Sequence, residues 1–136
     1  MKRLLLALLL LGCSAVWTYA AQVRAIPATL GADGNFDVTE ANAVGPVDAM
    51  TVYSDGVDGG GTLTFKACIT SAAGSCRNIL DVTGDGVTCN ATACTCTAAC
   101  TAQVKSSGTG PYRIYRMALS GSTTPTLALT ALVYKE

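Results

Sequence analysis

The sequence predicts an all-β protein: a small, disulfide-stapled β-sandwich of the jelly-roll type with about eight strands, preceded by an N-terminal hydrophobic signal segment. Apolar and polar residues alternate in short stretches separated by Gly, Asp, Asn, Ser and Pro, as in half-buried strands joined by turns. No apolar spacing of helical period is sustained over eleven residues. Six of the seven cysteines lie between positions 68 and 100, which suggests a local set of cross-links.

Length and composition indicate one folded domain. The chain has 136 residues, of which 50% are hydrophobic and 13% are charged, so it is too apolar to be disordered. The formal net charge is zero and no Lys/Arg cluster is longer than Lys2-Arg3. We therefore expect no nucleic-acid partner.

The N-terminal segment has the features of an export signal. Lys2 and Arg3 precede an unbroken apolar run from Leu4 to Leu11, and small residues follow at plausible cleavage positions up to Ala21. The run is shorter than the ~20 residues that a membrane-spanning helix needs. We expect a signal peptide over residues 1–21 and a β-sandwich domain over residues 22–136, secreted or extracellular, with the periplasm or the cell surface as further locations.

Cys13 is a candidate lipidation site. The segment Leu10-Leu11-Gly12-Cys13 resembles the bacterial lipobox, whose cysteine becomes the lipidated first residue of the mature protein. Leucine is larger than usual at the second position of that motif, which favours loss of Cys13 together with the signal. A membrane is expected as a partner only if Cys13 is lipidated.

The mature part contains eight candidate strands and no convincing helix. The two C-terminal strands have the clearest alternation, and the connection Gly121–Pro125 between them predicts a β-hairpin that closes the sheet. The expected strands are Gln22 to Leu30, Asn35 to Val38, Met50 to Ser54, Gly61 to Ile69, Arg77 to Val82, Ala102 to Ser106, Tyr112 to Ser120 and Thr126 to Tyr134.

The six cysteines after the signal predict three disulfides, since an even count in an exported chain is typical of a disulfide framework. Cys68 and Cys76 flank seven residues, and a hairpin turning at Ala72 would place them opposite one another. The other four are Cys89, Cys94, Cys96 and Cys100, which allow three pairings. A bridge from Cys94 to Cys96 is the least favourable because so short a ring strains disulfide geometry. A zinc or iron–sulfur site is disfavoured because the spacing lacks two separated C-x-x-C pairs.

No catalytic, cofactor or metal site is expected. The chain has no histidine, which removes the commonest general base and metal ligand. Asp33, Asn35 and Asp37 alternate like the start of a calcium loop, but Val38 and Val44 occupy the places of its turn glycine and bidentate glutamate. An Asx-rich turn is the preferred interpretation, and we expect the protein not to be an enzyme.

The segment from Met50 to Tyr134 resembles small β-sandwich, jelly-roll-like structural or decoration proteins from the virions of tailed phages. The resemblance is carried by a Gly-rich turn before a strand, a Gly-Pro-Tyr-Arg strand, a Leu-Ser-Gly turn and a Pro-containing turn. Here these are Gly59–Gly61 before Thr62–Ala67, Gly110–Arg116, Leu119–Gly121 and Thr124–Leu127. The resemblance implies a structural role on a virion.

Our leading hypothesis is a non-enzymatic structural or surface-display module of an extracellular assembly, as a virion decoration, fibre or coat subunit. Low charge and short Thr/Ala/Ser-rich strands favour close contacts between subunits, so self-association or a larger extracellular assembly is the expected partner. The alternative is a secreted binding domain for a glycan or other small ligand. A hydrolase would need two converging carboxylates, and no spacing in the sequence predicts such a pair.

Overall fold

A computed structural model describes residues 22–45, 47, 49–56, 60–105, 112–123 and 126–135. The predicted signal segment, residues 1–21, and the candidate lipidation site Cys13 lie outside this described part. Within it, no helix is long and apolar enough to span a membrane.

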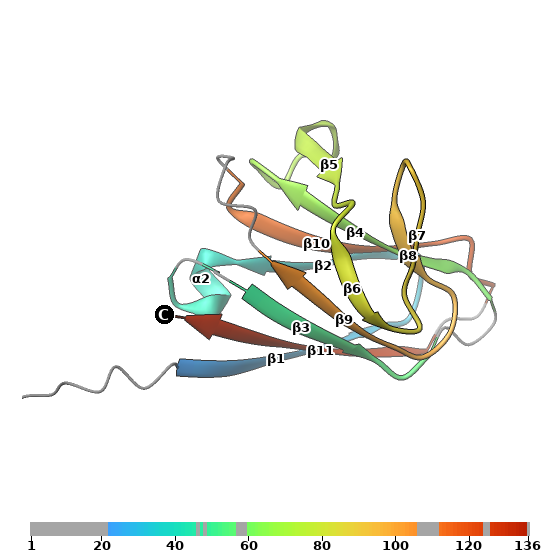
Figure 1. The fold of residues 1–136 in the computed structure, drawn as a ribbon, viewed down its shortest axis with the longest axis horizontal. Coiled ribbons are helices and arrows are strands. Elements are labelled where there is room, and N and C mark those ends of the chain that lie inside the picture. Colours follow the sequence, from blue (N-terminus) through green and yellow to red (C-terminus); the bar gives the residue numbers. More distant parts are fainter. Residues whose placement is uncertain are drawn as a thin grey trace, which may run out of the picture.

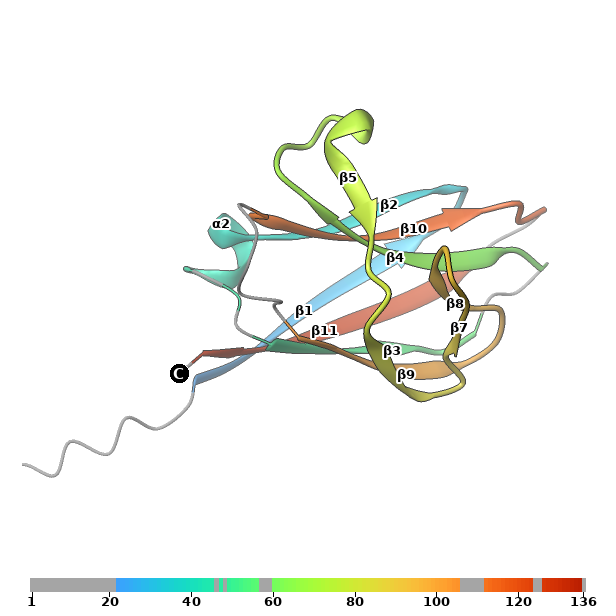
Figure 2. The same cartoon turned by 45° about the horizontal axis from the view of Figure 1, so that its top comes forward.

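Two antiparallel sheets pack against each other, as Figures 1 and 2 show from two directions. The five-stranded sheet has the order β1 (Gln22–Leu30), β11 (Leu127–Lys135), β3 (Ala49–Ser54), β9 (Cys100–Lys105) and β6 (Val82–Asp85). The six-stranded sheet has the order β2 (Gly34–Thr39), β10 (Ile114–Ser120), β4 (Thr62–Cys68), β8 (Cys94–Cys96) and β7 (Thr88–Cys89), and β5 (Cys76–Asn78) also pairs with β4. The predicted all-β sandwich is confirmed.

The strand pairing is that of a jelly roll. β1 pairs with β11, β2 with β10, β3 with β9 and β4 with β8, so the first four strands meet the last four in reverse order. The chain is therefore one long hairpin rolled into two sheets. The remaining strands β5, β6 and β7 lie between β4 and β8 in the sequence, at the tip of that hairpin. Seven of the eight predicted strands correspond to β1–β4 and β9–β11 of this frame, whereas β7 and β8 were not predicted.

The predicted C-terminal hairpin is wrong. β10 belongs to the six-stranded sheet and β11 to the five-stranded sheet, so the chain crosses from one layer to the other between them. Both strands have an apolar face toward the same core, with Met117 and Leu119 on β10 opposite Leu127 and Leu129 on β11 as fully or nearly fully buried side chains. Alternation shows which face of a strand is buried and does not show which strand is its neighbour.

The predicted strand from Arg77 to Val82 is also divided between the sheets. Its first part is β5, in the six-stranded sheet, and its end begins β6, in the five-stranded sheet. The sequence analysis also missed one short helix, α2 (Glu40–Ala43). Thr39 and Asn42 form a capping box at its start, which satisfies backbone groups that four residues cannot pair internally.

The core lies between the inner faces of the two sheets. Phe65, Leu63 and Met117 from one sheet meet Met50 and Leu129 from the other, each at most 2% exposed. Pro27 lies in β1, an edge strand of the five-stranded sheet, and edge strands are where proline is tolerated in a sheet.

The cysteines form three disulfides, which join Cys68 to Cys76, Cys89 to Cys94 and Cys96 to Cys100. The predicted bridge between Cys68 and Cys76 is confirmed, and these residues are direct partners in the ladder between β4 and β5. The structure selects one of the three pairings that the sequence left open for the other four. All three bridges lie at the tip of the rolled hairpin, and the paired sulfurs are not thiolates available to a metal.

Candidate functional site

The outward face of the five-stranded sheet carries mostly uncharged residues among those that the structure describes. Alternation along the strands places buried side chains inward and the intervening ones outward. Along β3, β9 and β11 the outward residues are Ala49, Thr51, Tyr53, Thr101, Gln103, Lys105, Ala128, Thr130, Leu132 and Tyr134. No described element covers this face, which forms the lower side of the molecule in Figure 2.

Among the described side chains, Lys105 on β9 and Asp85 on β6 are the charged ones on this face within the strands. Asp81 directly precedes β6, and the register of β6 with β9 places it beside Lys105. Asp55 directly follows β3, at the rim, where its carboxylate accepts a hydrogen bond of 2.9 Å from the backbone N–H of Ala128. In the middle of the face Thr51 is 8% exposed and donates from Oγ1 to the hydroxyl oxygen of Tyr134 at 3.5 Å. Neighbouring side chains on the face therefore cover Thr51.

The outward face of the six-stranded sheet has a different character, because it holds a buried ion pair. Arg116 on β10 donates from Nε and Nη2 to the two carboxylate oxygens of Asp37 on β2, each at 2.7 Å. Its Nη2 also donates to the backbone oxygen of Ser71 at 2.9 Å, and Nη1 lies 3.6 Å from Sγ of Cys76. Hydrogen bonding to Asp37 raises the pKa of Arg116, so the guanidinium stays charged. The pair fixes the loop between β4 and β5 onto the sheet.

Asp33 makes a second tertiary contact, distinct from that pair. Its carboxylate accepts hydrogen bonds from Ser122 Oγ at 2.6 Å, Gly121 N at 2.8 Å and Ser122 N at 3.0 Å. These bonds lower the pKa of Asp33. The turn interpretation of the segment from Asp33 to Asp37 was incomplete, because residues 34–39 form β2 and the two aspartates bind separate partners.

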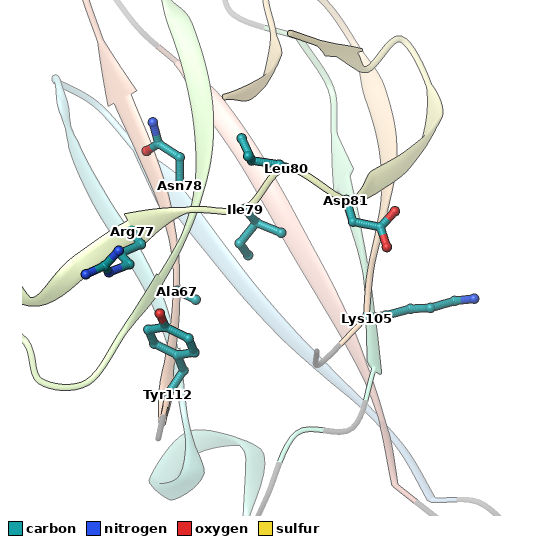
Figure 3. Close-up of a pocket in the computed structure, with 8 residues that line it drawn as sticks. All are labelled: Ala67, Arg77, Asn78, Ile79, Leu80, Asp81, Lys105 and Tyr112. Atoms are coloured by element: carbon teal, nitrogen blue, oxygen red, sulfur yellow. The ribbon is translucent and has the colours of Figure 1, made fainter. Parts of the chain in front are cut away.

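A small hollow lies where the chain crosses from β5 to β6 (Figure 3). Its volume is about 280 Å³ and its middle is formed by apolar parts of Ala67, Ile79 and Tyr112. Arg77 and Lys105 extend from its opposite sides and point away from each other, so they do not converge on one anion. The hollow is at the small end of the ~300–1,000 Å³ typical of ligand pockets.

The comparisons with known proteins add no relative: no family model, no curated protein and no solved structure matches this chain. Among the described residues, no group of three or more His, Cys, Asp or Glu side chains gathers where it could hold a metal ion. Sequence reasoning identified the cysteines and missed the bond between Arg116 and Asp37. The signal that would have revealed it is a charged residue within an otherwise apolar strand, Ile114–Leu119.

Proposed function

We propose that this chain is a non-enzymatic structural or surface-display module in an extracellular assembly, as a virion decoration, fibre or coat subunit. The observation that carries the proposal is the outward face of the five-stranded sheet, whose described outward residues on β1, β3 and β11 are uncharged and whose charges lie toward one side, at Lys105, Asp85 and Asp81, with Asp55 at the rim. A solvated sheet face usually carries more charge, and depletion of charge is a property of interface centres.

Rigidity supports the same role. Three disulfides staple the tip of the rolled hairpin, and the buried pair of Arg116 and Asp37 ties the loop between β4 and β5 to the sheet. Ordered surfaces lose less conformational entropy on association. The disulfides are also compatible with an oxidising extracellular location.

The test is fractionation of a producing culture on a density gradient, followed by immunodetection of the chain. Co-sedimentation with particles, fibres or cell envelopes is the expected result. The Tyr53→Glu variant places a charge in the face, at a side chain that is 44% exposed and whose substitution should leave the fold intact. It should shift the chain to the soluble fractions, whereas recovery of the wild-type protein only as a free monomer would overturn the proposal.

The second candidate function is binding of a glycan or other small ligand, which the hollow beside β5 favours. Tyr112 supplies an aromatic ring and a hydroxyl next to apolar Ile79, with Arg77 at one end, a combination suited to a sugar ring with polar substituents. The test is a ligand-detected NMR screen of mono- and disaccharides against the wild type and Tyr112→Ala. Binding that the variant abolishes would favour this function, and binding that is equal in both would exclude the hollow.

A further inference from the structure

We infer that the free edges of β1 and β2 are protected against the addition of a further strand, with Pro27 and Asn42 as the residues that block them. The strands that they exclude are β1 and β2 of a second copy of this chain. Among the described strands, β1 and β2 are end strands of the two sheets, and they contact each other. Both edges therefore lie on one side of the sandwich. The inference goes beyond the proposed function and does not depend on it.

These two edges are the ones at which strand addition is easiest. β1 has nine residues and β2 has six, whereas β6 and β7, the end strands on the other side, have four and two. An end strand presents unpaired N–H and C=O groups to any extended chain that meets it, and a very short strand limits this tendency. For β1 and β2, length gives no such protection.

Asn42 occupies the free edge of β2 with its side-chain amide. Its Nδ2 donates to the backbone oxygen of Asp37 at 2.8 Å, and its Oδ1 accepts from the backbone N–H of Thr39 at 2.7 Å. In a strand, the C=O of one residue and the N–H of the second residue after it point to the same side, here away from β10. A neighbouring strand would bind these two groups with an N–H and a C=O of its own. The amide of Asn42 therefore takes the place of a neighbouring strand.

The short helix α2, which directly follows β2 (Figure 1), holds Asn42 in this position. Thr39 is its N-cap, and Thr39 Oγ1 accepts the backbone N–H of Asn42 at 3.2 Å. Ala43 is buried and anchors the helix to the core. Val44 ends the helix with a φ of 58°, a left-handed conformation that is unfavourable for a β-branched residue. Such a conformation persists only where the surrounding structure requires it, so α2 is a fixed part of the fold.

Pro27 blocks β1 by a different means, because its nitrogen carries no hydrogen. On β11, the backbone N–H of Ala128 donates to the Asp55 carboxylate and its C=O accepts from the Asp55 N–H, so both groups face the β3 side. By alternation the backbone groups of Thr130 face the same way, and Thr130 is the ladder partner of Pro27. The nitrogen of Pro27 therefore points away from β11. A strand added to this edge would find no donor at its middle.

The presence of a block on both edges indicates what they exclude. A single extended peptide needs one free edge, and blocking the other would have no effect on it. A second copy turned by a two-fold rotation would instead present β1 to β1 and β2 to β2, and would extend both sheets together. Protection against such a partner requires a block on each strand.

Sedimentation-velocity ultracentrifugation over a range of concentrations tests the inference on protein produced from the full chain. Pro27→Ala adds a donor to the β1 edge, and Asn42→Ala frees the backbone groups of Asp37 and Thr39. Each should raise the association constant at least about tenfold over that of the wild type, and the double variant further, because additional inter-chain hydrogen bonds can form. The matched control is Asn35→Ala, at an exposed residue of β2, which should associate as the wild type does.

Hydrogen exchange shows whether the association uses these edges. In Asn42→Ala the amide of Thr39 should lose protection in dilute solution and regain it on association, while β10 and β11 keep theirs. Pro27→Ala should stay folded because its nitrogen faces solvent, so it tests the inference independently of the stability of Asn42→Ala.

Two results would overturn the inference. One is folded variants that associate no more strongly than the wild type, or no more strongly than Asn35→Ala. The other is association of Asn42→Ala in which the Thr39 amide still exchanges freely, because the contact would then lie away from the β2 edge.

Discussion

Arg116 shows how one polar residue inside a strand organises its surroundings. Its side chain is 7% exposed, and that of Asp37 is 25% exposed. Burial of a guanidinium is unfavourable unless it is paired and its hydrogen-bond donors are satisfied, and here two strands and a loop supply the acceptors. Arg113, three residues earlier, is exposed. Arg116 lies inside the largely apolar strand Ile114–Ser120, whereas Arg113 precedes that strand.

Removing the carboxylate from this pair should destabilise the fold strongly. Asp37→Asn leaves Arg116 charged and largely buried without its counter-ion, and we expect a loss of about 2–3 kcal/mol in the free energy of unfolding, moderated by the partial exposure of Asp37. Urea denaturation measures it, with Lys66→Gln on the same sheet face as the control. A loss no greater than that of the control would contradict the role assigned to the pair. Asp37→Leu combined with Arg116→Met should recover much of the stability.

Asp33 gives stability a defined pH dependence. Because the pKa of Asp33 is lowered in the folded protein from its ordinary 3.8, its contribution is fully present above that value and is lost as the pH falls through the lowered folded-state pKa. The difference in unfolding free energy between the wild type and Asp33→Asn should therefore be larger at about pH 6 than at about pH 2. Chemical denaturation at both pH values measures this difference, and a gap that widens in acid would refute the assignment.

At the scale of elements, Gly84 in β6 occupies a position that no other residue fits. Its φ is +141°, and a Cβ there would overlap the backbone oxygen of Thr101 on β9. We expect Gly84→Ala to lower the free energy of unfolding by at least about 2 kcal/mol through backbone strain and displacement of β6. The control is Gly31→Ala, where a Cβ would meet nothing within 4 Å. Thermal denaturation of both variants provides the comparison, and equal melting temperatures would show that β6 shifts at no cost.

The elements also show what the sequence could and could not predict. Alternation identified most strands, and turn residues identified most of their ends, because both depend on nearby residues. The connection from β10 to β11 looked like a hairpin because its length suits one, but the chain there joins two layers. Neither the order of strands in each sheet nor the rows on their outward faces can be derived locally, since Asp85 and Thr101 become ladder partners only through pairing of β6 with β9.

For the molecule as a whole, the disulfides divide the chain into a cross-linked part, residues 68–100, and a remainder that contains no disulfide among its described residues. The bridges close loops of 8, 5 and 4 residues in sequence separation, and each should contribute about 2–3 kcal/mol by the loop-entropy model. The pairs β1 with β11 and β2 with β10 contain no cysteine. Reduction should therefore loosen residues 68–100 first.

Hydrogen exchange followed by mass spectrometry tests that division. In a reductant at native pH, amides between Cys68 and Cys100 should exchange faster, while those in β10 and β11 keep their protection. The Cys68→Ala/Cys76→Ala double variant should show the same effect near β5 without reductant. Uniform loss of protection over the whole chain would mean that the frame depends on the bridges as well.

The pairing of the first described strand with the last has a mechanical consequence. Gln22 and Lys135 are direct partners on antiparallel strands, so the two ends of the described chain leave the molecule side by side. Tension applied between Gln22 and Lys135 would break the hydrogen bonds of the β1–β11 ladder one after another, starting at this end. It would not load many of these bonds at the same time. A fibre whose subunits are linked through their termini would therefore yield at low force. Subunits that must resist stretching would have to carry that force through contacts between their sheet faces.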